Sequence, residues 1–412
     1  MSSESPPGST PLDSVSMLRP SSTPMSSTQM PSTQMSSTQM SSTQMSWAQV
    51  LSTLLRREDL DREAAEWAMT QIMSGEAMPA QIGGFLIGLR SKGETAGEID
   101  ALVDVMLSHA VRVEVRGVAV DVVGTGGDGA HTVNISTMAA VIAAAAGARV
   151  VKHGNRAASS TTGTADLLEH LGVAIGLESD GIVECLDLAG IAFCFAPTFH
   201  PAMRFAGPTR RELGVPTVFN VLGPLANPAQ PAAQLIGAAD ARLAPVMADV
   251  LAARGVAAIV ARGEDGLDEL TTLSATRVWE TTSGQAVESL IDAADLGIRR
   301  PATNALRGGD ADFNAEVATQ VLAAVRSATL DPVRDAVALN SAAAIVAHDS
   351  AAQKAQEPCV VPNQRIDAPL IARLSDALAV AYEALDSGAA AEKLRTWVSV
   401  SSALAAARRP SH

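Results

Sequence analysis

Apolar side chains recur at helical spacing in the first part of the chain after residue 46. Four stretches show it, from Trp47 to Leu55, from Asp61 to Gly75, from Ile82 to Leu89 and from Glu98 to Leu107. Asp61 is a capping candidate, and Gly75 stands where a helix would end. Apolar positions repeated every three to four residues are typical of amphipathic helices. The pattern therefore predicts a small all-helical unit that ends near residue 112.

Beyond residue 112 the pattern changes to short β-branched runs separated by helical stretches. The runs lie in residues 115–127, 149–155, 173–177, 191–197, 234–239 and 257–263, and an Ala-rich helix closed by Gly147 follows the first of them. Continuous apolar runs that alternate with helices are typical of buried parallel strands. The fold class predicted is therefore α/β: a small N-terminal helical domain and a larger domain with a mostly parallel central sheet covered by helices.

Residues 1–45 differ in composition from the rest. Five successive pentads, SSTPM, SSTQM, PSTQM, SSTQM and SSTQM, occupy residues 21–45. Without aromatic or β-branched aliphatic residues, such pentads cannot bury enough apolar surface to offset the entropy of ordering. We expect a disordered tail here.

Composition excludes several classes of function. The 412-residue chain carries a formal net charge of −14, which disfavours binding to nucleic acid or to anionic membranes. Its three cysteines, Cys185, Cys194 and Cys359, show no C-x-x-C spacing and indicate neither a disulfide framework nor a zinc site. The longest apolar run, residues 138–148, is too short to span a membrane. We expect a protein of the reducing cytoplasm.

Residues 124–129, GTGGDG, match the G-x-G-x-x-G pattern of dinucleotide-binding proteins. That fingerprint requires a helix that begins inside the motif and an acid about 20 residues later. Here seven residues, 130–136, precede the Ala-rich helix, and the second strand leads instead into KHGNRAASSTTGT at 152–164. Its donors are Lys152, Asn155, Arg156, Ser159, Ser160 and Thr164. Two neighbouring loops rich in N–H groups and cations predict a site for a diphosphate or phosphoribosyl group.

Acidic residues accompany this anion site. Asp128 lies inside the first loop, and Glu264, Asp265, Asp268 and Glu269 follow the run at 257–263. Mg²⁺ binds through one or two carboxylates together with substrate phosphates, so these acids are candidates to hold it. The alternative is that the four-acid run is a solvated surface turn.

Four motifs in order resemble the anthranilate phosphoribosyltransferases. They are GTGGDGAHTVNIST at 124–137, KHGNRAASS at 152–160, FHPAMRFAGPTRRELGVPTVFNVLGPLANPA at 199–229 and GLDEL at 266–270. The resemblance covers about residues 47–405. It implies a helical domain over 46–115, joined by about 205–220 and hinged to an α/β domain over 116–204 and 221–405, with tails at 1–45 and 406–412. It also implies a homodimer.

The resemblance assigns residues to each ligand. For phosphoribosyl diphosphate it implies Gly124, Gly127, Asp128, Thr132, Asn134, Ile135, Ser136 and Thr137 in the first loop, and Lys152, His153, Gly154, Asn155, Arg156, Ala157, Ala158, Ser159, Ser160 and Thr164 in the second. For anthranilate it implies Gly124, Asn155 and Arg210, with His153, Pro197 and His200 along the path. For Mg²⁺ it implies Ser136, Asp268 and Glu269. As alternatives, Arg210 could be a surface cation and the two histidines could be structural.

Three features depart from the family pattern. Met203 stands where some members carry an aromatic residue, and SSTTGTA at 159–165 lacks the commoner lysine. Residues 349–365 are expected to form a loop inserted between two C-terminal helices.

The resemblance implies a Mg²⁺-dependent transfer of the phosphoribosyl group to the amine of anthranilate, a step of L-tryptophan and hence aromatic amino-acid biosynthesis. An aromatic amine is unprotonated near neutrality, so no catalytic acid or base is expected. Two alternatives stay open: a pyrimidine nucleoside phosphorylase, which has a related architecture, and a relative that binds nucleic acid, which the charge of −14 disfavours.

Overall fold

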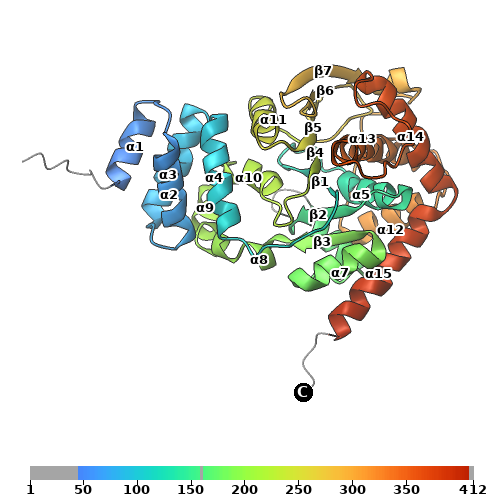
Figure 1. Cartoon of the computed structure of the whole chain (residues 1–412), viewed down its shortest axis with the longest axis horizontal. Helices are drawn as coiled ribbons and strands as arrows, with labels where there is room; N and C mark the ends of the chain where they lie inside the picture. The colour runs from blue at the N-terminus through green and yellow to red at the C-terminus, as the bar shows by residue number, and fades with distance from the viewer. Residues whose placement is uncertain (1–44, 158–160, 408–412) are drawn as a thin grey trace, which may run out of the picture. The chain divides into compact units, whose positions relative to one another are not determined.

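A computed structural model describes residues 45–157 and 161–407 (Figure 1). The predicted tail at 1–45 lies outside the described residues except for Met45, and the segment 158–160 and the end of the chain from 408 lie outside them as well. None of the helices in the described part is long and apolar enough to cross a membrane.

The helical part begins with four helices, α1 (Trp47–Leu55), α2 (Arg62–Met73), α3 (Pro79–Lys92) and α4 (Ala96–Ser108). Side-chain caps fix the starts of α2 and α4. The Asp61 side chain accepts the N–H of Ala64, as the sequence predicts, and Thr95 forms a reciprocal capping box with Glu98. Gly75, with φ of 76°, lies directly after the end of α2. The four predicted helices are therefore confirmed.

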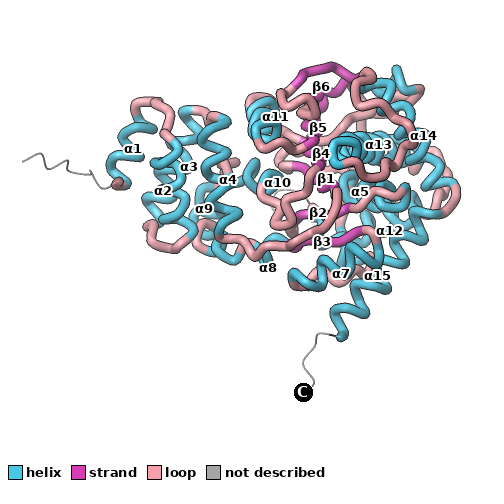
Figure 2. Tube along the Cα trace, in the orientation of Figure 1, coloured by secondary structure: helices cyan, strands magenta, loops and turns pink. Residues whose placement is uncertain are grey.

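The α/β part is built on one seven-stranded sheet (Figure 2). Its order is β3 (Ile191–Phe195), β2 (Val150–Gly154), β1 (Val120–Gly124), β4 (Ala233–Gly237), β5 (Ala257–Gly263), β6 (Ala275–Glu280) and β7 (Val287–Asp292). The first five are parallel, while β5, β6 and β7 pair antiparallel. The mostly parallel sheet is confirmed, and the antiparallel edge was not predicted.

One predicted strand is wrong. Residues 173–177 form no strand, although Val173, Ile175 and Leu177 are buried. They connect α6 (Thr164–His170) to α7 (Ser179–Ala189) and pack into the core without a partner strand. Alternating burial requires only a surface to pack against, so this pattern does not by itself establish sheet pairing.

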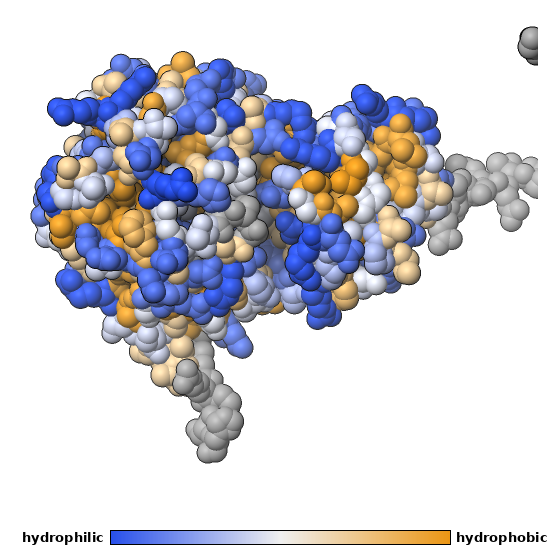
Figure 3. Space-filling model, turned by 180° about the vertical axis from the view of Figure 1, so that it is seen from behind, coloured by the Kyte–Doolittle hydropathy of each residue, from blue (hydrophilic) through white to orange (hydrophobic). Residues whose placement is uncertain are grey.

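Successive strand residues face different cores. Val122 packs with α5 (Ile135–Ala146) and the C-terminal helices α13 (Asp331–Ala355), α14 (Leu370–Asp386) and α15 (Ala389–Ala407). Val123 packs in the second core, which also includes helices α1 to α4, α10 (Phe219–Leu225) and α11 (Leu243–Ala253). One face of the sheet thus shares its core with the helical part. The face drawn in Figure 3 is mostly hydrophilic, with separate apolar patches.

The remaining elements are short or peripheral. They are α8 (Ala196–Phe199), η1 (Pro201–Arg204), α9 (Gly207–Leu213), η2 (Ala293–Leu296) and α12 (Ala311–Leu322). Helix α9 contacts α3, and α10 contacts α4, so the segment near 205–220 packs against the helical part.

The loop expected at 349–365 is shorter than its sequence indicates. Helix α13 continues to Ala355, and α14 begins at Leu370. Polar residues occur inside this helix because they bind the connection that follows it. The Asp349 carboxylate accepts the N–H groups of Val360 and Val361 at 2.7 and 2.8 Å. The polar residues at the end of α13 therefore belong to the helix, and Asp349 among them binds the connection to α14.

Candidate functional site

The two glycine- and cation-rich loops follow neighbouring strands. β1 pairs in parallel with β2 on one side and with β4 on the other, so the loops after Gly124 and Gly154 leave the same edge of the sheet. Helix α5 begins only at Ile135. The absence of a helix start inside residues 124–129 agrees with the argument against a dinucleotide fingerprint.

Glycine is required in the first loop for two reasons. Gly126, Gly127 and Gly129 have φ of 67°, 85° and 69°, in the left-handed region that side chains rarely adopt. At Gly124 a Cβ would lie 2.5 Å from a carboxylate oxygen of Asp268. The same oxygen accepts the N–H of Gly126 at 2.7 Å. The acid at residue 268 is thus built into the first loop.

Lys152 is a buried cation at the centre of this region. Its side chain is 1% exposed. The ammonium donates to the carbonyl of Val122 and lies 3.4 Å from the Ser136 hydroxyl. Burial lowers the pKa of Lys152, and the charges of Asp121 and Glu269 only partly oppose this.

The four-acid run divides into two pairs. Glu264 and Asp265 are exposed, as a surface turn would be. Asp268 is half-buried and Glu269 is buried, so the surface-turn alternative does not describe these two. Burial raises the pKa of Glu269 to about 8, although Lys152 opposes the shift. Burial, followed by the nearby charges of Glu269 and Asp128, raises the pKa of Asp268 well above its usual range.

This donor set fits a hard divalent cation. The backbone N–H of Ser136 binds Glu269, so the hydroxyl-bearing residue and the acids adjoin one another. Carboxylates that repel each other in a buried setting are stabilised by a cation, and oxygen donors suit Mg²⁺. Among the described residues, no group of three or more His, Cys, Asp and Glu side chains is arranged to hold a metal ion by itself. Mg²⁺ needs none, since it usually completes its shell with water and substrate phosphates.

His153 and His200 form a buried pair with ring centroids 5.2 Å apart. Nδ1 of His153 lies 3.1 Å from the Gly223 carbonyl, and Nε2 of His200 lies 2.9 Å from the Ala226 carbonyl. Among the described residues, the other nitrogen of each ring has no partner. Burial lowers the pKa of His153 to about 3 and that of His200 to about 4, so both rings are neutral at pH 7.

The other residues predicted to line the acceptor path differ in exposure. Arg210 on α9 is partly buried, with its guanidinium 5.0 Å from the centre of the Phe219 ring. It has no ion pair within the described part of the chain, and burial lowers its pKa. Pro197 is exposed at the start of α8, Asn155 is exposed, and Met203 packs at the edge of the second core.

The second loop is only partly described, because Ala158, Ser159 and Ser160 lie outside the described residues. Arg156 is exposed and pairs with Asp166 at 2.9 Å and Glu169 at 2.5 Å. The N–H of Ala157 also binds Asp166. The positive charge of Arg156 is therefore paired with surface carboxylates.

Polar groups at and just before the starts of α5 and α6 face one another. Thr137 Oγ lies 3.4 Å from that of Thr164, and Asn134 binds the carbonyl of Thr162 at 3.0 Å. The Ile135 side chain is 1% exposed in the core, which leaves only its backbone for a ligand. Thr132 forms a bridge with Arg307.

Sequence reasoning missed two groups that support these loops. Asp121 is fully buried, and its carboxylate accepts the N–H of His153 at 3.0 Å and the amide of Asn227 at 2.9 Å. Burial raises the pKa of Asp121 to about 6, although Lys152 opposes the shift. The second group, residues 306–314, contacts both loops. Asn227 lies inside the quoted 199–229 motif, and the pair Gly308-Gly309 was the available signal for the second group.

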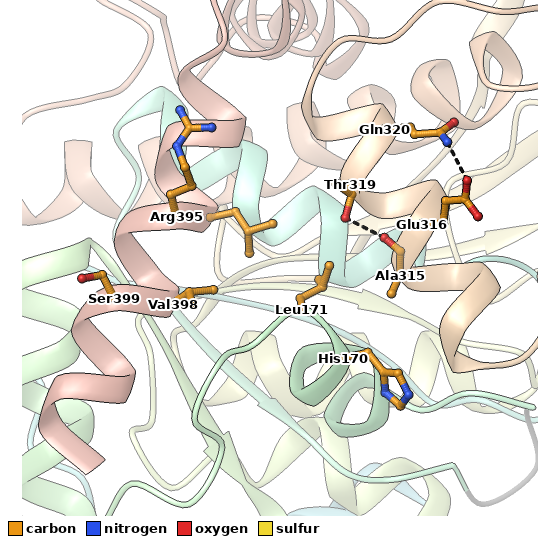
Figure 4. A pocket seen from close by; sticks show the side chains of 10 residues that line it. His170, Leu171, Ala315, Glu316, Thr319, Gln320, Arg395, Val398 and Ser399 are labelled. Carbon is orange, nitrogen blue, oxygen red and sulfur yellow. Dashed lines mark hydrogen bonds between the residues drawn. The ribbon is translucent and has the colours of Figure 1, made fainter. Parts of the chain in front are cut away.

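The cavity in Figure 4 lies elsewhere. Its volume is about 670 Å³, and its walls come from the end of α6, from α12 and from α15. None of the predicted site residues lines it.

Comparison with known proteins shows which family models and sequences the chain matches. Residues 116–391 match the family model "Glycosyl transferase family, a/b domain", and residues 48–110 match the corresponding helical bundle domain. The chain is 54% identical to an anthranilate phosphoribosyltransferase of Salinispora arenicola over 87% of this chain and 97% of the relative. It is 51% identical to the one of Streptomyces griseus, over 87% and 96%.

Solved structures agree. The crystal structure of the Thermus thermophilus anthranilate phosphoribosyltransferase matches with a TM-score of 0.75 and 37% identity, over 86% of this chain and 99% of that one. The Saccharomyces cerevisiae enzyme in complex with PRPP (phosphoribosyl diphosphate) and Mg matches with a TM-score of 0.73 and 25% identity, over 87% and 99%. With matches of this extent in sequence and in fold, the chain belongs to the anthranilate phosphoribosyltransferase family.

Proposed function

We propose that this protein transfers the phosphoribosyl group from phosphoribosyl diphosphate to the amine of anthranilate, giving N-(5-phosphoribosyl)anthranilate and diphosphate in L-tryptophan biosynthesis. Family membership supports this activity. The structural observation that carries it is the meeting of two strand-end loops with buried Lys152 and the Asp268–Glu269 pair at one edge of the sheet. This edge combines donors for an anion with acids for a cation.

The chain's own groups would bind and orient the donor. The first loop offers backbone N–H groups, and Ser136, Thr137 and Thr164 offer hydroxyls. Lys152 lies behind them as a buried amine whose positive charge the nearby Asp121 and Glu269 carboxylates favour and burial opposes. Asp268 and Glu269, with Ser136, would hold Mg²⁺, which when bound neutralises charge on the departing diphosphate. Binding groups held in place by the sheet need little reorganisation during the reaction.

The acceptor side requires no proton relay before attack. The bond between the anomeric carbon and diphosphate breaks, a bond from the amine nitrogen forms, and the nitrogen releases one proton to solvent. The Arg210 guanidinium, which has no ion pair among the described residues, can bind the anthranilate carboxylate through two parallel hydrogen bonds. The neutral rings of His153 and His200 add no charge to the acceptor path.

A fluorescence assay tests this function. Anthranilate fluorescence should fall only when phosphoribosyl diphosphate and Mg²⁺ are both present. In parallel, thymidine or uridine is incubated with inorganic phosphate and the free base is measured. Phosphorolysis without consumption of anthranilate would reject the proposal in favour of a pyrimidine nucleoside phosphorylase.

We also propose that the enzyme is a homodimer of the cytoplasm. Large apolar side chains are exposed on the helical part, including Leu55 on α1 at 83% and Ile87 on α3 at 38%. Figure 3 also shows apolar patches on the face that it draws, and contiguous exposed apolar patches often mark an interface with another chain. Light scattering after gel filtration measures the mass, and a value equal to a single chain would reject the dimer.

A further inference from the structure

Residues 306–314 lie against both loops of the candidate site, although more than 140 residues separate them in sequence. The N–H of Val133 binds the carbonyl of Leu306 at 3.0 Å, and the N–H of Gly308 binds that of His131 at 2.8 Å. Thr132 and Arg307 form an antiparallel bridge between these two contacts. The segment therefore pairs with the end of the first loop as a short strand would.

Four hydrogen bonds then close a ring that reaches the second loop. The Asn134 amide donates to the carbonyl of Thr162 at 3.0 Å. The Thr162 hydroxyl donates to the carbonyl of Gly309 at 3.1 Å. The N–H of Gly309 donates to the amide oxygen of Asn314 at 2.9 Å, and the Asn314 amide donates to Asn134 Oδ1 at 2.9 Å. We call these four residues the amide ring.

The amide ring is partly buried and uses both ends of each asparagine side chain. Asn314 is 2% exposed and Thr162 is 5% exposed. A buried hydrogen bond is costly to leave unmade, so each member holds the next in one orientation. Asn134 occupies the position directly before α5, the helix that follows the first loop, and Thr162 lies two residues before α6 at the end of the second loop.

We infer that Asn314 and Gly308 are positioning residues for phosphoribosyl diphosphate, because they set the spacing between the two loops that would bind it. The inference rests on the proposed function. Neither residue needs to touch the ligand. Loops displaced by about 1 Å would lose simultaneous contact with the two ends of a diphosphate-bearing sugar, and such displacement can cost up to about a hundredfold in rate.

The backbone of Thr132 approaches Gly308 so closely that a side chain does not fit there. A Cβ at this position would lie 2.6 Å from the Thr132 carbonyl oxygen and 2.9 Å from Asn314 Oδ1. A backbone carbonyl fixed in a bridge cannot rotate away, so Gly308→Ala should push residues 306–309 from the first loop. This change removes no hydrogen-bonding group, whereas Asn314→Ala removes two of the four hydrogen bonds of the amide ring.

The experiment compares these two variants with matched controls. Ser401→Ala removes the partner of a backbone N–H, that of Ala174, as Asn314→Ala does for Gly309. Gly176→Ala adds a Cβ that meets nothing within 4 Å. Binding of phosphoribosyl diphosphate with Mg²⁺ is measured by isothermal titration calorimetry, and KM is measured for each substrate.

For Asn314→Ala and Gly308→Ala we expect Kd and KM for phosphoribosyl diphosphate to rise about tenfold or more. The KM for anthranilate should rise less, because Arg210 and His200 belong to elements outside the amide ring, although Gly124 and Asn155 lie on the displaced loops. Both controls should keep wild-type values for each substrate. Because the two changes act on the same loop spacing, the double variant should show less than the product of the single effects.

The outcomes separate the inference from the proposed function. A wild-type protein that neither binds phosphoribosyl diphosphate nor consumes anthranilate would reject the function. Normal wild-type activity with both variants within twofold in Kd would overturn the inference alone. An equal rise in both KM values, or a fully multiplicative double variant, would also overturn it, because either result means separate structural damage. If Asn314→Ala does not fold, Gly308→Ala provides the same readout.

Discussion

Charged groups at the strand ends differ from those between the helices in how they are paired. Near the carboxyl ends of the parallel strands, Lys152 on β2 and Glu269 after β5 are buried. Burial lowers the pKa of Lys152 and raises that of Glu269, so it favours the neutral form of each. Between α2, α4 and α11, Arg254 instead binds Asp100 at 2.7 Å and Asp104 at 2.6 Å.

The helix network behaves as ordinary ion pairs do. Arg62 also binds Asp104, at 2.9 Å. Partial burial alone would raise the pKa of Asp104, but hydrogen bonds from Arg254 and Arg62 lower it. Paired charges hold elements together, whereas buried charges with perturbed pKa values cluster at functional sites. We therefore expect changes at the strand ends to affect activity more than stability, and changes in the helix network to do the reverse.

The largest effect is expected for the double variant Asp268→Asn, Glu269→Gln. Activity at saturating anthranilate should fall by roughly 10³-fold, and the Mg²⁺ concentration for half-maximal rate should rise, because the ion loses both charged ligands. The free energy of unfolding at pH 7 without Mg²⁺ should not fall. The raised pKa of Glu269 means that stability is lost as pH rises from 4.5 to about 8, and an amide avoids this loss.

Glu264→Gln is the matched control, since this exposed acid belongs to the same run and pairs with Arg277. It should leave the Mg²⁺ titration unchanged. Superimposable titrations of the wild type and the double variant would reject the metal assignment.

A smaller effect, confined to one substrate, is expected for Arg210→Ala. The anthranilate KM should rise about 30-fold, which corresponds to about 2 kcal/mol for a hydrogen-bonded charge, while the KM for phosphoribosyl diphosphate changes little. Arg211→Ala, the exposed neighbour on α9, serves as control. An equal rise in both KM values would assign Arg210 to structure or to the phosphate side.

Acid sensitivity tests the buried histidine pair. The folded pKa of His200, about 4, lies below the usual 6.5, so its contribution to stability is complete above 6.5 and is lost as pH falls toward 4. His200→Gln keeps a donor for the Ala226 carbonyl. The variant should lose about 1.5 kcal/mol less than the wild type between pH 6.5 and pH 5.

The quantity to compare is the loss of unfolding free energy between pH 6.5 and pH 5 in the variant and in the wild type. The wild-type loss alone is not sufficient, because Asp121, with a raised pKa of about 6, stabilises the folded protein as pH falls over this range. Urea unfolding at both pH values measures the two losses. Equal losses in both proteins would show that His200 is not the acid-sensitive group.

The smallest effect is expected in the helix network. Arg254→Ala should lower the free energy of unfolding by about 1 kcal/mol and leave kcat/KM within about twofold. Arg56→Ala, which removes an exposed pair with Glu58, should change stability by less than about 0.5 kcal/mol. A tenfold loss of kcat/KM in Arg254→Ala would contradict the expectation that changes in the helix network affect stability more than activity.

Local patterns in the sequence were sufficient for much of the fold. The helices at 47–108 have their capping residues and apolar spacing within a few positions of one another, and β1 to β5 coincide with short runs rich in apolar residues. Residues 173–177 show the limit, because their burial looks the same along the chain whether or not a strand pairs with them. The antiparallel β6 and β7 escaped prediction because an edge hairpin is defined largely by its pairing with β5.

For the candidate site, the sequence by itself determined which residue types were present: a glycine-rich loop, one lysine, hydroxyls and a run of four acids. Only the tertiary structure decided that Asp268 and Glu269 are set apart from exposed Glu264 and Asp265, and that Arg156 pairs with surface acids. It alone decided that Asn314 joins Asn134 to Thr162. The physical reason is that burial and long-range hydrogen bonds depend on which distant segments the sheet brings together. A local sequence pattern does not contain that information.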